Sequence, residues 1–337
     1  MESIYYVMSY LCHRTCEHCY EDRFRPYYGT ELEAVLAQSQ TNFPLVIRNL
    51  PRRMQYRDTE GQWRRGSIIL AGGEILLPAL RESVLYPGIR LLQEKYGNEG
   101  GVKIIVQTTG DTLSDKVASE LRQLGVWMVS VSGIDAFHQG LETVEAQEAM
   151  KAKCSRILEA AGFEAVTSVA AASREPHDEG HYFHYFGATP DMWIGKLWPR
   201  GRAWRNGLST AGLEDNFCNQ WSGGLNFLNI GEKGSEVSID PEGRVYPCCV
   251  KTKKAIGNLC EEPLENILAR HRGNPVYEAI SAGRPEDMGR EHGWSREKFL
   301  EKSRTLLPDG RAYVNRCIGC DAFHDEVLMQ ELVQLAV

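Results

Sequence analysis

The sequence predicts an α/β fold, a partial (β/α)6 barrel followed by a small α+β domain. Apolar strand-like runs alternate with helical patterns through the first two thirds of the 337 residues, which is typical of a parallel sheet with crossover helices. After about residue 206 hairpin turn signals replace this alternation. We therefore expect a barrel over residues 1–207 and a cysteine-containing domain over residues 208–337.

The elements of the barrel follow from short apolar runs and from helical periodicity. Strands are predicted over residues 4–10, 67–70, 102–107, 126–131, 165–170 and 192–197. Helices are predicted over residues 31–40, 79–95, 113–124 and 144–161. Residues 42–66 interrupt the rhythm and are either an excursion near the active-site end or a solvated surface loop.

Turn residues organise the C-terminal third. Strand-like runs at 226–230 and 236–239 flank a Gly-Glu-Lys-Gly turn, and a second turn, Asp-Pro-Glu-Gly, leads into a run at 245–246. Helical patterns follow at 264–270, 275–282 and 321–335.

Charge and composition narrow the class of partner. The net charge of −7 disfavours a nucleic-acid partner, because phosphate binding needs a basic face. The apolar stretch at 4–11 is too short to span a bilayer, and no basic segment precedes it. We expect a cytoplasmic protein without a membrane partner, whose ten cysteines are reduced or bound to metal.

Three cysteines follow the first predicted strand within eight residues: Cys12, Cys16 and Cys19. Three thiolates on one loop bind three irons of a cubane and leave the fourth iron open, as a chelating cosubstrate requires. Zinc is the alternative, although structural zinc sites usually have four protein ligands. A redox-sensing trio is a third interpretation.

This C-x3-C-x2-C motif resembles the hallmark of the radical S-adenosylmethionine (SAM) superfamily, and the resemblance covers roughly residues 4–205. It implies one [4Fe–4S] cluster on the three cysteines and SAM as cosubstrate. Further residues match positions that the family uses to bind SAM: His18 near the adenine, Gly72, Gly73 and Glu74 in a GGE motif that contacts the methionyl amino group, Thr108, and Ser130 and Ser132 near the ribose.

Two features weaken this resemblance, and a third extends it. Thr109 stands where the family often has Asn, and each serine could instead be satisfied within its own strand. The run Pro-Arg-Gly-Arg-Ala at 199–203 is similar to one in members that carry a C-terminal cluster domain.

The later cysteines resemble the shortened SPASM domain, called a twitch domain, which binds one auxiliary cluster in the order Cys, G-x4-C, C-x2-C. The matching ligands are Cys218, Cys248, Cys317 and Cys320. The gap between Cys218 and the glycine is longer than usual, and zinc on the same thiols is the alternative. A second [4Fe–4S] cluster is therefore expected.

Three cysteines remain after seven are assigned to clusters. Cys249 should point away from its neighbour Cys248, because side chains alternate along extended backbone. Cys154 is expected in a core helix, and Cys260 is either a core residue or a substitute ligand.

The resemblance implies an enzyme in which a 5′-deoxyadenosyl radical removes a substrate hydrogen, with an electron donor such as flavodoxin or ferredoxin. Our first hypothesis is an epimerase that returns a hydrogen from the Cys249 thiol, similar to the antibiotic-biosynthesis epimerases, including the conversion of neomycin C to neomycin B. A polycationic aminoglycoside would suit the acidic chain. Candidate amine partners are Asp135, Glu175, Asp178, Glu179 and Asp191.

Three alternatives remain open. An aminocyclitol dehydrogenase would use the auxiliary cluster as electron acceptor and would need no donor thiol. A peptide maturase would often carry a leader-binding domain, which we do not expect ahead of the barrel because Cys12 lies near the N-terminus. A non-enzymatic electron carrier would not need the GGE run.

Overall fold

The computed structural model describes residues 1–166, 179–188, 194–220 and 223–329. Within these ranges a nine-stranded sheet has the order β11-β10-β9-β1-β4-β5-β6-β8-β7. The strands that run parallel are β1 (Ser3–Val7), β4 (Ser67–Ala71), β5 (Lys103–Thr108), β6 (Met128–Ser132), β7 (Glu164–Ala165), β8 (Tyr182–Phe186) and β9 (Glu236–Ile239). The predicted α/β fold class, with its parallel sheet and small C-terminal domain, is confirmed.

The central strands are buried along their whole length. Every residue of β1 and β4 is buried, and their register pairs Tyr6 with Leu70. Such unbroken burial is characteristic of parallel strands that are covered on both faces.

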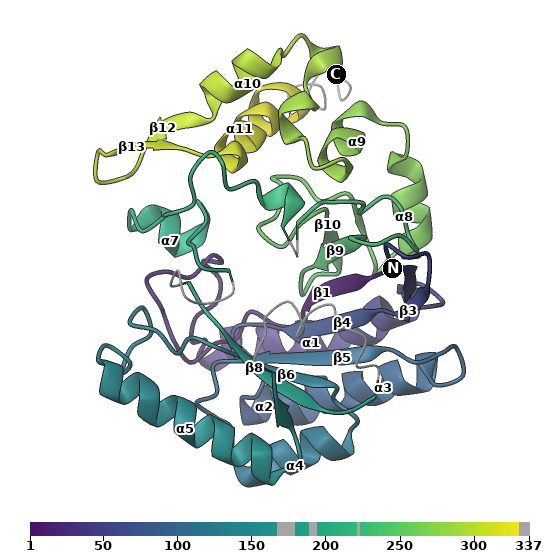
Figure 1. Ribbon diagram of the computed structural model, residues 1–337, viewed down its shortest axis with the longest axis vertical. Helices are drawn as coiled ribbons and strands as arrows, with labels where there is room; N and C mark the ends of the chain where they lie inside the picture. The colour runs from purple at the N-terminus through teal and green to yellow at the C-terminus, as the bar shows by residue number, and fades with distance from the viewer. Residues whose placement is uncertain (167–178, 189–193, 221–222, 330–337) are drawn as a thin grey trace.

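Helices of the first half cover this sheet (Figure 1). They are α1 (Gly29–Asn49), α2 (Pro78–Leu80), η1 (Arg81–Leu85), α3 (Tyr86–Tyr96), α4 (Asp115–Gln123) and α5 (Val144–Ala160). In α4, the Ser114 hydroxyl accepts a hydrogen bond from Val117 N, which caps the helix start, and Gly125 follows its end with a φ of 71°. The helix buries Val117 and Leu121 against the core.

The C-terminal third lies on the other side of the sheet from α4 and α5, and β10 (Arg244–Tyr246) and β11 (Gly257–Asn258) extend the sheet beyond β9 (Figure 1). Its helices are α7 (Gly201–Arg205), η2 (Phe217–Asn219), α8 (Leu264–His271), α9 (Pro275–Ser281), η3 (Pro285–Asp287), η4 (Arg290–His292), α10 (Arg296–Lys302), α11 (Arg316–Phe323) and η5 (His324–Leu328). Among the described residues there are also two small hairpins, β2 (Gln55–Arg57) with β3 (Trp63–Arg65) and β12 (Arg304–Leu306) with β13 (Ala312–Val314).

The sheet crosses the predicted domain boundary. Strand β9 pairs in parallel with β1, and Ile4 lies opposite Val237. The division at residues 207 and 208 therefore stays a prediction, because part of the second segment completes the sheet of the first.

Several individual elements differ from the sequence prediction. The run at 226–230 is a turn and not a strand, since Asn226 has a φ of 54°. Strand β8 was not predicted, yet it occupies the place beside β6. Of the strand predicted at 192–197, the described residues 194–197 contain only the isolated bridge between Gly187 and Ile194.

The excursion at 42–66 also differs from its first interpretation. Residues 42–49 continue α1, and residues 55–65 form the β2–β3 hairpin. Gly66 N bonds to Met54 O, and Gly66 packs against the backbone of Met1 and Glu2. This contact places the hairpin at the amino ends of β1 and β4, away from the carboxyl ends where barrel active sites form.

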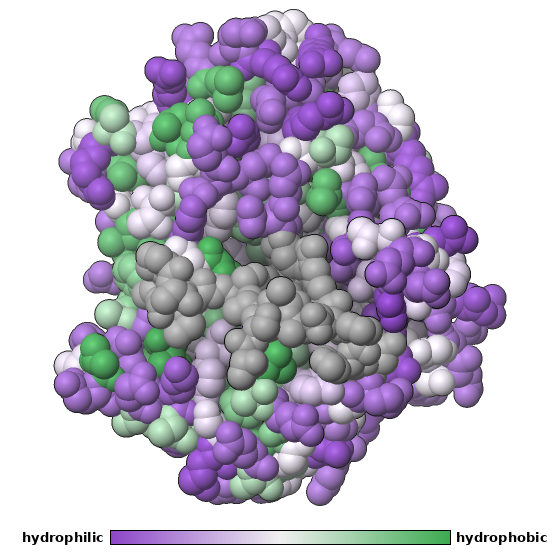
Figure 2. Space-filling view, in the orientation of Figure 1, coloured by the Kyte–Doolittle hydropathy of each residue, from purple (hydrophilic) through white to green (hydrophobic). Residues whose placement is uncertain are grey.

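The described residues on the face shown in Figure 2 are mainly hydrophilic, with hydrophobic side chains in small separate groups. No helix of the described ranges is both long and apolar enough to cross a membrane.

Candidate active site and cysteine sites

A cavity of about 240 Å³ opens at the carboxyl ends of the strands. It is lined by residues of the first cysteine loop, the strand ends and the C-terminal third. The predicted site residues among its lining are Cys12, Cys16, His18, Cys19, Gly72, Gly73, Thr108, Ser132 and Cys249. The cysteine loop, the predicted SAM-binding residues at the strand ends and Cys249 therefore line one cavity, although they come from distant parts of the chain.

Arg202 of α7 organises the cysteine loop. Its guanidinium donates to three loop carbonyls: Cys16 O at 2.7 Å, Asp22 O at 2.9 Å and Phe24 O at 2.8 Å. Gly201 allows α7 to sit so close, because a Cβ there would lie 2.4 Å from the carbonyl carbon of Tyr20. The run around Arg202 carries a family resemblance, but its local pattern does not predict this contact.

The GGE segment packs on the start of the same loop. A Cβ on Gly73 would lie 2.4 Å from Leu11 O and 2.5 Å from Cys12 Cβ, so only glycine fits there. Glu74 N also donates to Leu11 O at 3.0 Å. Gly73 thus permits the GGE segment to lie close to the backbone of the cysteine loop, which is a structural role separate from contact with a ligand.

Glu74 itself is buried and does not line the cavity. Its carboxylate accepts hydrogen bonds from Thr108 Oγ1 at 2.8 Å and from Thr109 N at 2.7 Å. The motif glutamate therefore fixes the end of β5, and its role toward SAM stays a prediction.

Asp111 links that strand end to the cysteine loop. It accepts hydrogen bonds from Arg14 Nε at 2.7 Å and from Thr109 Oγ1 at 3.0 Å, and it lies 2.8 Å from His13 Nε2. Burial alone would raise the pKa of Asp111, but hydrogen bonds from His13 and Arg14 lower it to about 2. The Asp111 carboxylate is therefore charged, and in that form it binds both His13 and Arg14 of the cysteine loop.

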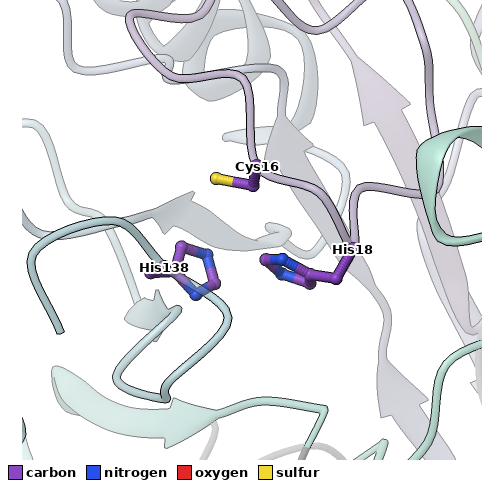
Figure 3. Close-up of side chains that lie close together, drawn as sticks. All are labelled: Cys16, His18 and His138. Atoms are coloured by element: carbon purple, nitrogen blue, oxygen red, sulfur yellow. The ribbon is translucent and has the colours of Figure 1, made fainter. Parts of the chain in front are cut away.

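His18 lies against His138 and Cys16 (Figure 3). The ring centroids of the two histidines are 4.4 Å apart, and the candidate ligand atoms of all three residues lie within 4.8 Å of one another. Asp135 approaches His138 Nδ1 at 2.9 Å, an arrangement that orients metal-ligating histidines. A single zinc ion on these three residues is therefore an alternative to a cluster on the three cysteines.

The two predicted serines have different surroundings. Ser132 lines the cavity, and its hydroxyl donates to Thr108 O at 3.3 Å. Ser130 is buried outside the cavity lining, with its hydroxyl 2.5 Å from His184 Nε2. Ser130 thus has a structural partner within the sheet.

A second, smaller cavity is lined by the four predicted auxiliary ligands, Cys218, Cys248, Cys317 and Cys320. Asparagine side chains shape two of the segments: Asn216 accepts from Cys218 N at 3.1 Å, and Asn315 caps α11 by accepting from Cys317 N at 2.8 Å. Burial, then the neighbouring thiols, raise the pKa of Cys218 well above its usual value. Metal binding here would release protons.

An all-thiol donor set suits an iron–sulfur cluster or a structural zinc ion, and both are held by four cysteines. In the first cavity three thiols share an open space with glycine backbone, which suits a cluster with one open iron. The residues at both positions therefore fit the clusters that the family resemblance implies.

Cys248 and Cys249 face different cavities. Cys248 lines the four-cysteine site and Cys249 lines the first cavity, while Phe217 and Val250 line both. Burial, then Cys248, raise the pKa of Cys249 well above its usual value. A thiol therefore stands in the wall between the two sites.

The two remaining cysteines lie elsewhere. Cys154 is buried in α5, with its sulfur 4.0 Å from Gly110 O. Cys260 Sγ lies 3.6 Å from Glu242 O and lines neither cavity. Cys260 is thus not grouped with the four predicted auxiliary ligands.

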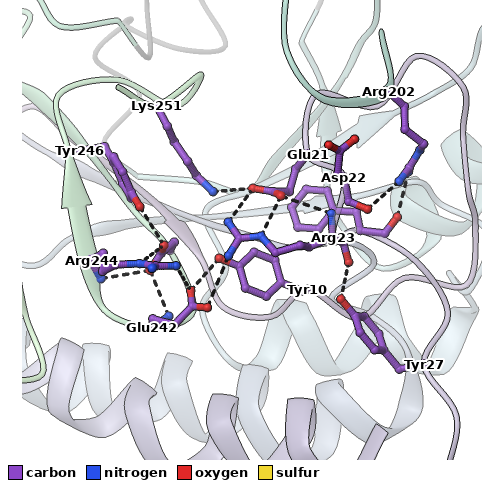
Figure 4. Close-up of polar contacts among 12 residues, drawn as sticks. Tyr10, Glu21, Asp22, Arg23, Tyr27, Arg202, Glu242, Arg244, Tyr246 and Lys251 are labelled. Atoms are coloured by element: carbon purple, nitrogen blue, oxygen red, sulfur yellow. Dashed lines mark hydrogen bonds and ion pairs between the residues drawn. The ribbon is translucent and has the colours of Figure 1, made fainter. Parts of the chain in front are cut away.

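A network of charged groups joins the first cysteine loop to the β9–β10 hairpin (Figure 4). Arg23 bonds to Glu21 at 2.9 Å and to Glu242 at 3.4 Å, and Tyr10 donates to Glu242 at 2.7 Å. Lys251 Nζ donates to Glu21 Oε2 at 2.6 Å. The two cysteine-bearing segments are therefore held together by partly buried ion pairs.

The proposed amine partners are only partly described. Asp135 lines the cavity, but it is already bonded to His138. Glu179 is exposed and pairs with Arg65, away from the cavity lining. Glu175, Asp178 and Asp191 lie outside the described residues.

Some cavity residues carried no sequence signal. Tyr5 lines the cavity beside Tyr20 and Gln107, and its hydroxyl lies 3.1 Å from Tyr20 Oη and donates to Gln107 Oε1 at 3.1 Å. Trp198 lines it as well, next to Phe217. Single aromatic or amide residues in a strand look like ordinary core positions, so only their convergence identifies them.

One known family matches part of the C-terminal third. Residues 232–287 match the SPASM family, an iron–sulfur cluster-binding domain. This stretch of the chain is similar to SPASM domains. The predicted resemblance to proteins with a SPASM-type cluster domain is confirmed over these residues. No curated protein sequence matches the chain.

Solved structures with weak likeness to this chain include three different proteins. BtrN in complex with AdoMet and 2-DOIA is 13% identical, with 88% of this chain and 92% of that chain covered and a TM-score of 0.43. Native anSMEcpe with bound AdoMet is 15% identical, with 100% and 99% covered and a TM-score of 0.45. Streptococcus suis SuiB bound to the precursor peptide SuiA is 12% identical, with 83% and 66% covered and a TM-score of 0.42.

Proposed function

We propose that this protein is a radical SAM epimerase that inverts a carbon centre of an aminoglycoside sugar, as in the conversion of neomycin C to neomycin B. The observation that carries this proposal is the orientation of Cys249, which lines the first cavity although its neighbour Cys248 lines the four-cysteine site. A dehydrogenase would have no need of a thiol in that wall.

In the proposed reaction Cys12, Cys16 and Cys19 would hold the first [4Fe–4S] cluster, and His18, Gly72 and Gly73 would border the SAM site. When bound, the cluster and SAM would supply the radical chemistry that removes a hydrogen atom from the substrate. The apolar side chains that dominate the cavity wall, among them Phe186, Trp198 and Phe217, exclude water from that step.

Cys249 then acts on the opposite face of the substrate carbon. Its S–H bond breaks homolytically, a new C–H bond forms, and a thiyl radical remains on the sulfur. One electron from a low-potential donor protein and one proton from solvent restore the thiol. The net result is inversion without oxidation of the substrate.

Dehydrogenation of an aminocyclitol alcohol is the second candidate. A specific observation favours it: the four-cysteine site shares wall residues Phe217 and Val250 with the first cavity, so an acceptor cluster would stand close to the substrate. Peptide modification, the third reaction that the family resemblance leaves open, has no such observation in its favour among the described residues.

An anaerobic incubation of reconstituted protein with SAM, dithionite and neomycin C in deuterated water separates these reactions. The epimerase predicts the inverted product with one deuterium at the inverted carbon, because the thiol hydrogen exchanges with solvent. A ketone product would instead support dehydrogenation. Formation of 5′-deoxyadenosine without any change in the sugar would reject both the substrate and the epimerase.

A further inference from the structure

Arg200 is a nearly buried cation that joins three segments. Its side chain is 15% exposed, and Nε donates to Val250 O at 2.8 Å. Nη1 donates to Asp321 Oδ2 at 2.9 Å and to Pro199 O at 2.9 Å. Nη2 donates to Asp321 Oδ1 at 3.0 Å and to Lys251 O at 3.4 Å. The guanidinium is therefore fixed in position by every nitrogen.

This fixed cation stands in the wall of the four-cysteine site. Arg200 lines that cavity together with Cys218, Cys248, Cys317 and Cys320. Asp321 directly follows Cys320 in α11, so the carboxylate that pairs with Arg200 also comes from the segment that holds two of the predicted ligands. The Arg200 side chain is charged because a guanidinium does not lose its proton in proteins.

We propose that Arg200 and Asp321 set the reduction potential of the auxiliary cluster by opposite electrostatic effects; this inference rests on the proposed presence of that cluster. Reduction adds one negative charge to the cluster. A nearby cation stabilises the reduced state and raises the potential, whereas a nearby anion lowers it. Both charges act strongly because they are largely shielded from water.

The test is a redox titration, followed by paramagnetic resonance, of reconstituted full-length protein and three variants. Arg200→Gln should lower the auxiliary potential by at least a tenfold change in the reduction equilibrium, about 59 mV for one electron. Asp321→Asn should raise it, since the cation is then uncompensated. Arg200→Lys should keep a potential nearer to that of the unaltered protein, because it keeps the charge.

The matched control is Arg205→Gln. Arg205 lies in the same short helix but pairs with Asp22 at the surface, with side chains 60% and 45% exposed. Its variant should leave the auxiliary potential unchanged, and the first cluster should keep its potential in all four variants.

Opposite shifts for Arg200→Gln and Asp321→Asn are the result expected. Shifts of the same sign, or full iron with no shift, would overturn the proposal, and so would loss of the auxiliary cluster from all three variants. If Arg200→Gln alone loses iron, the potentials of Asp321→Asn and Arg200→Lys still test the proposal, because Asp321→Asn should raise the auxiliary reduction potential and Arg200→Lys should leave it nearly unchanged. Absence of a second cluster from the unaltered protein would instead reject the proposed function.

Discussion

Lys251 Nζ lies 2.6 Å from Glu21 Oε2, and each residue stands two positions after a cysteine of the first cavity, Lys251 after Cys249 and Glu21 after Cys19. Their side chains are 14% and 11% exposed. Hydrogen bonds from Arg23 and Lys251 outweigh the effect of burial and lower the pKa of Glu21 to about 2, so the pair is charged at neutral pH. The pair ties the proposed donor thiol to the first cysteine loop.

Breaking this pair should destabilise the protein. Lys251→Met leaves Glu21 with less compensation in a buried place, which typically costs about 3 kcal/mol. The control is Lys253→Met, because Lys253 pairs with Asp325 at the surface, where both side chains are about half exposed and a pair is worth under about 1 kcal/mol. Urea unfolding of both variants measures the difference, and equal midpoints would show that the Lys251–Glu21 contact does not stabilise the fold.

Metal content tests the first cavity. Reconstituted protein should bind about eight irons, the sum of two cubanes, and the Cys12, Cys16 and Cys19 triple alanine variant should keep about four. His138→Ala separates the alternative: a cluster on the three cysteines should survive it, whereas a zinc ion on Cys16, His18 and His138 should be lost. Zinc in the unaltered protein that disappears in His138→Ala would contradict the cluster assignment.

The four-cysteine site is tested by single substitutions. Cys248→Ala and Cys317→Ala should each lose the auxiliary cluster and destabilise the C-terminal third, because metal binding there contributes to folding. Cys260→Ala and Cys154→Ala are matched controls, since neither sulfur lines that cavity. Iron loss in Cys260→Ala together with full iron in Cys248→Ala would show that the ligand set is different.

Cys249→Ala tests the hydrogen donor. The variant should keep both clusters, cleave SAM and still remove the substrate hydrogen, because abstraction precedes donation. It should lose the inverted product, since alanine has no weak S–H bond, and a substrate radical should accumulate for detection by paramagnetic resonance. Unchanged epimer formation would reject the thiol-donor mechanism, and iron loss would make Cys249 a ligand.

Asp111 should make stability depend on pH in the acidic range. Its pKa is about 2 in the folded protein against about 3.8 unfolded, so the stabilisation is complete above the unfolded pKa and is lost as pH falls through the folded pKa. Asp111→Asn should therefore cost about 1–2 kcal/mol at pH 7, and the difference should shrink between pH 4 and pH 2. Urea unfolding of cluster-free protein at several pH values measures it; a pH-independent difference would exclude the charge as the cause.

Local sequence rules were sufficient for the first cysteine loop, where the spacing of Cys12, Cys16 and Cys19 predicts three thiols on one loop. Cys248 and Cys249 do line different cavities, but for another reason than the one expected. They lie in a turn after the end of β10 and not on a strand, so the alternation of strand side chains does not explain their directions.

Contacts between distant segments were beyond sequence reasoning. The hydrogen bond from Arg202 to Cys16 O spans 186 positions, and nothing in the local pattern links the two. The buried carboxylate of Glu74 is a second example. It accepts a hydrogen bond from Thr108 at the end of β5, and the sequence shows two threonines there but not this contact. Strand β8 was missed because its Tyr-Phe-His-Tyr-Phe run is short and contains no aliphatic residue, although aromatic residues favour strands.

The pairing of β1 with β9 also has a consequence for biosynthesis. Ser3 finds its sheet neighbour only at Glu236, so one edge of the first strand stays exposed on the ribosome until about two thirds of the chain has emerged. Contacts of such sequence separation are slow to form, and unpaired strand edges promote association with other chains. We therefore expect the nascent protein to depend on chaperones during this interval, and insertion of the auxiliary cluster to follow closure of this edge.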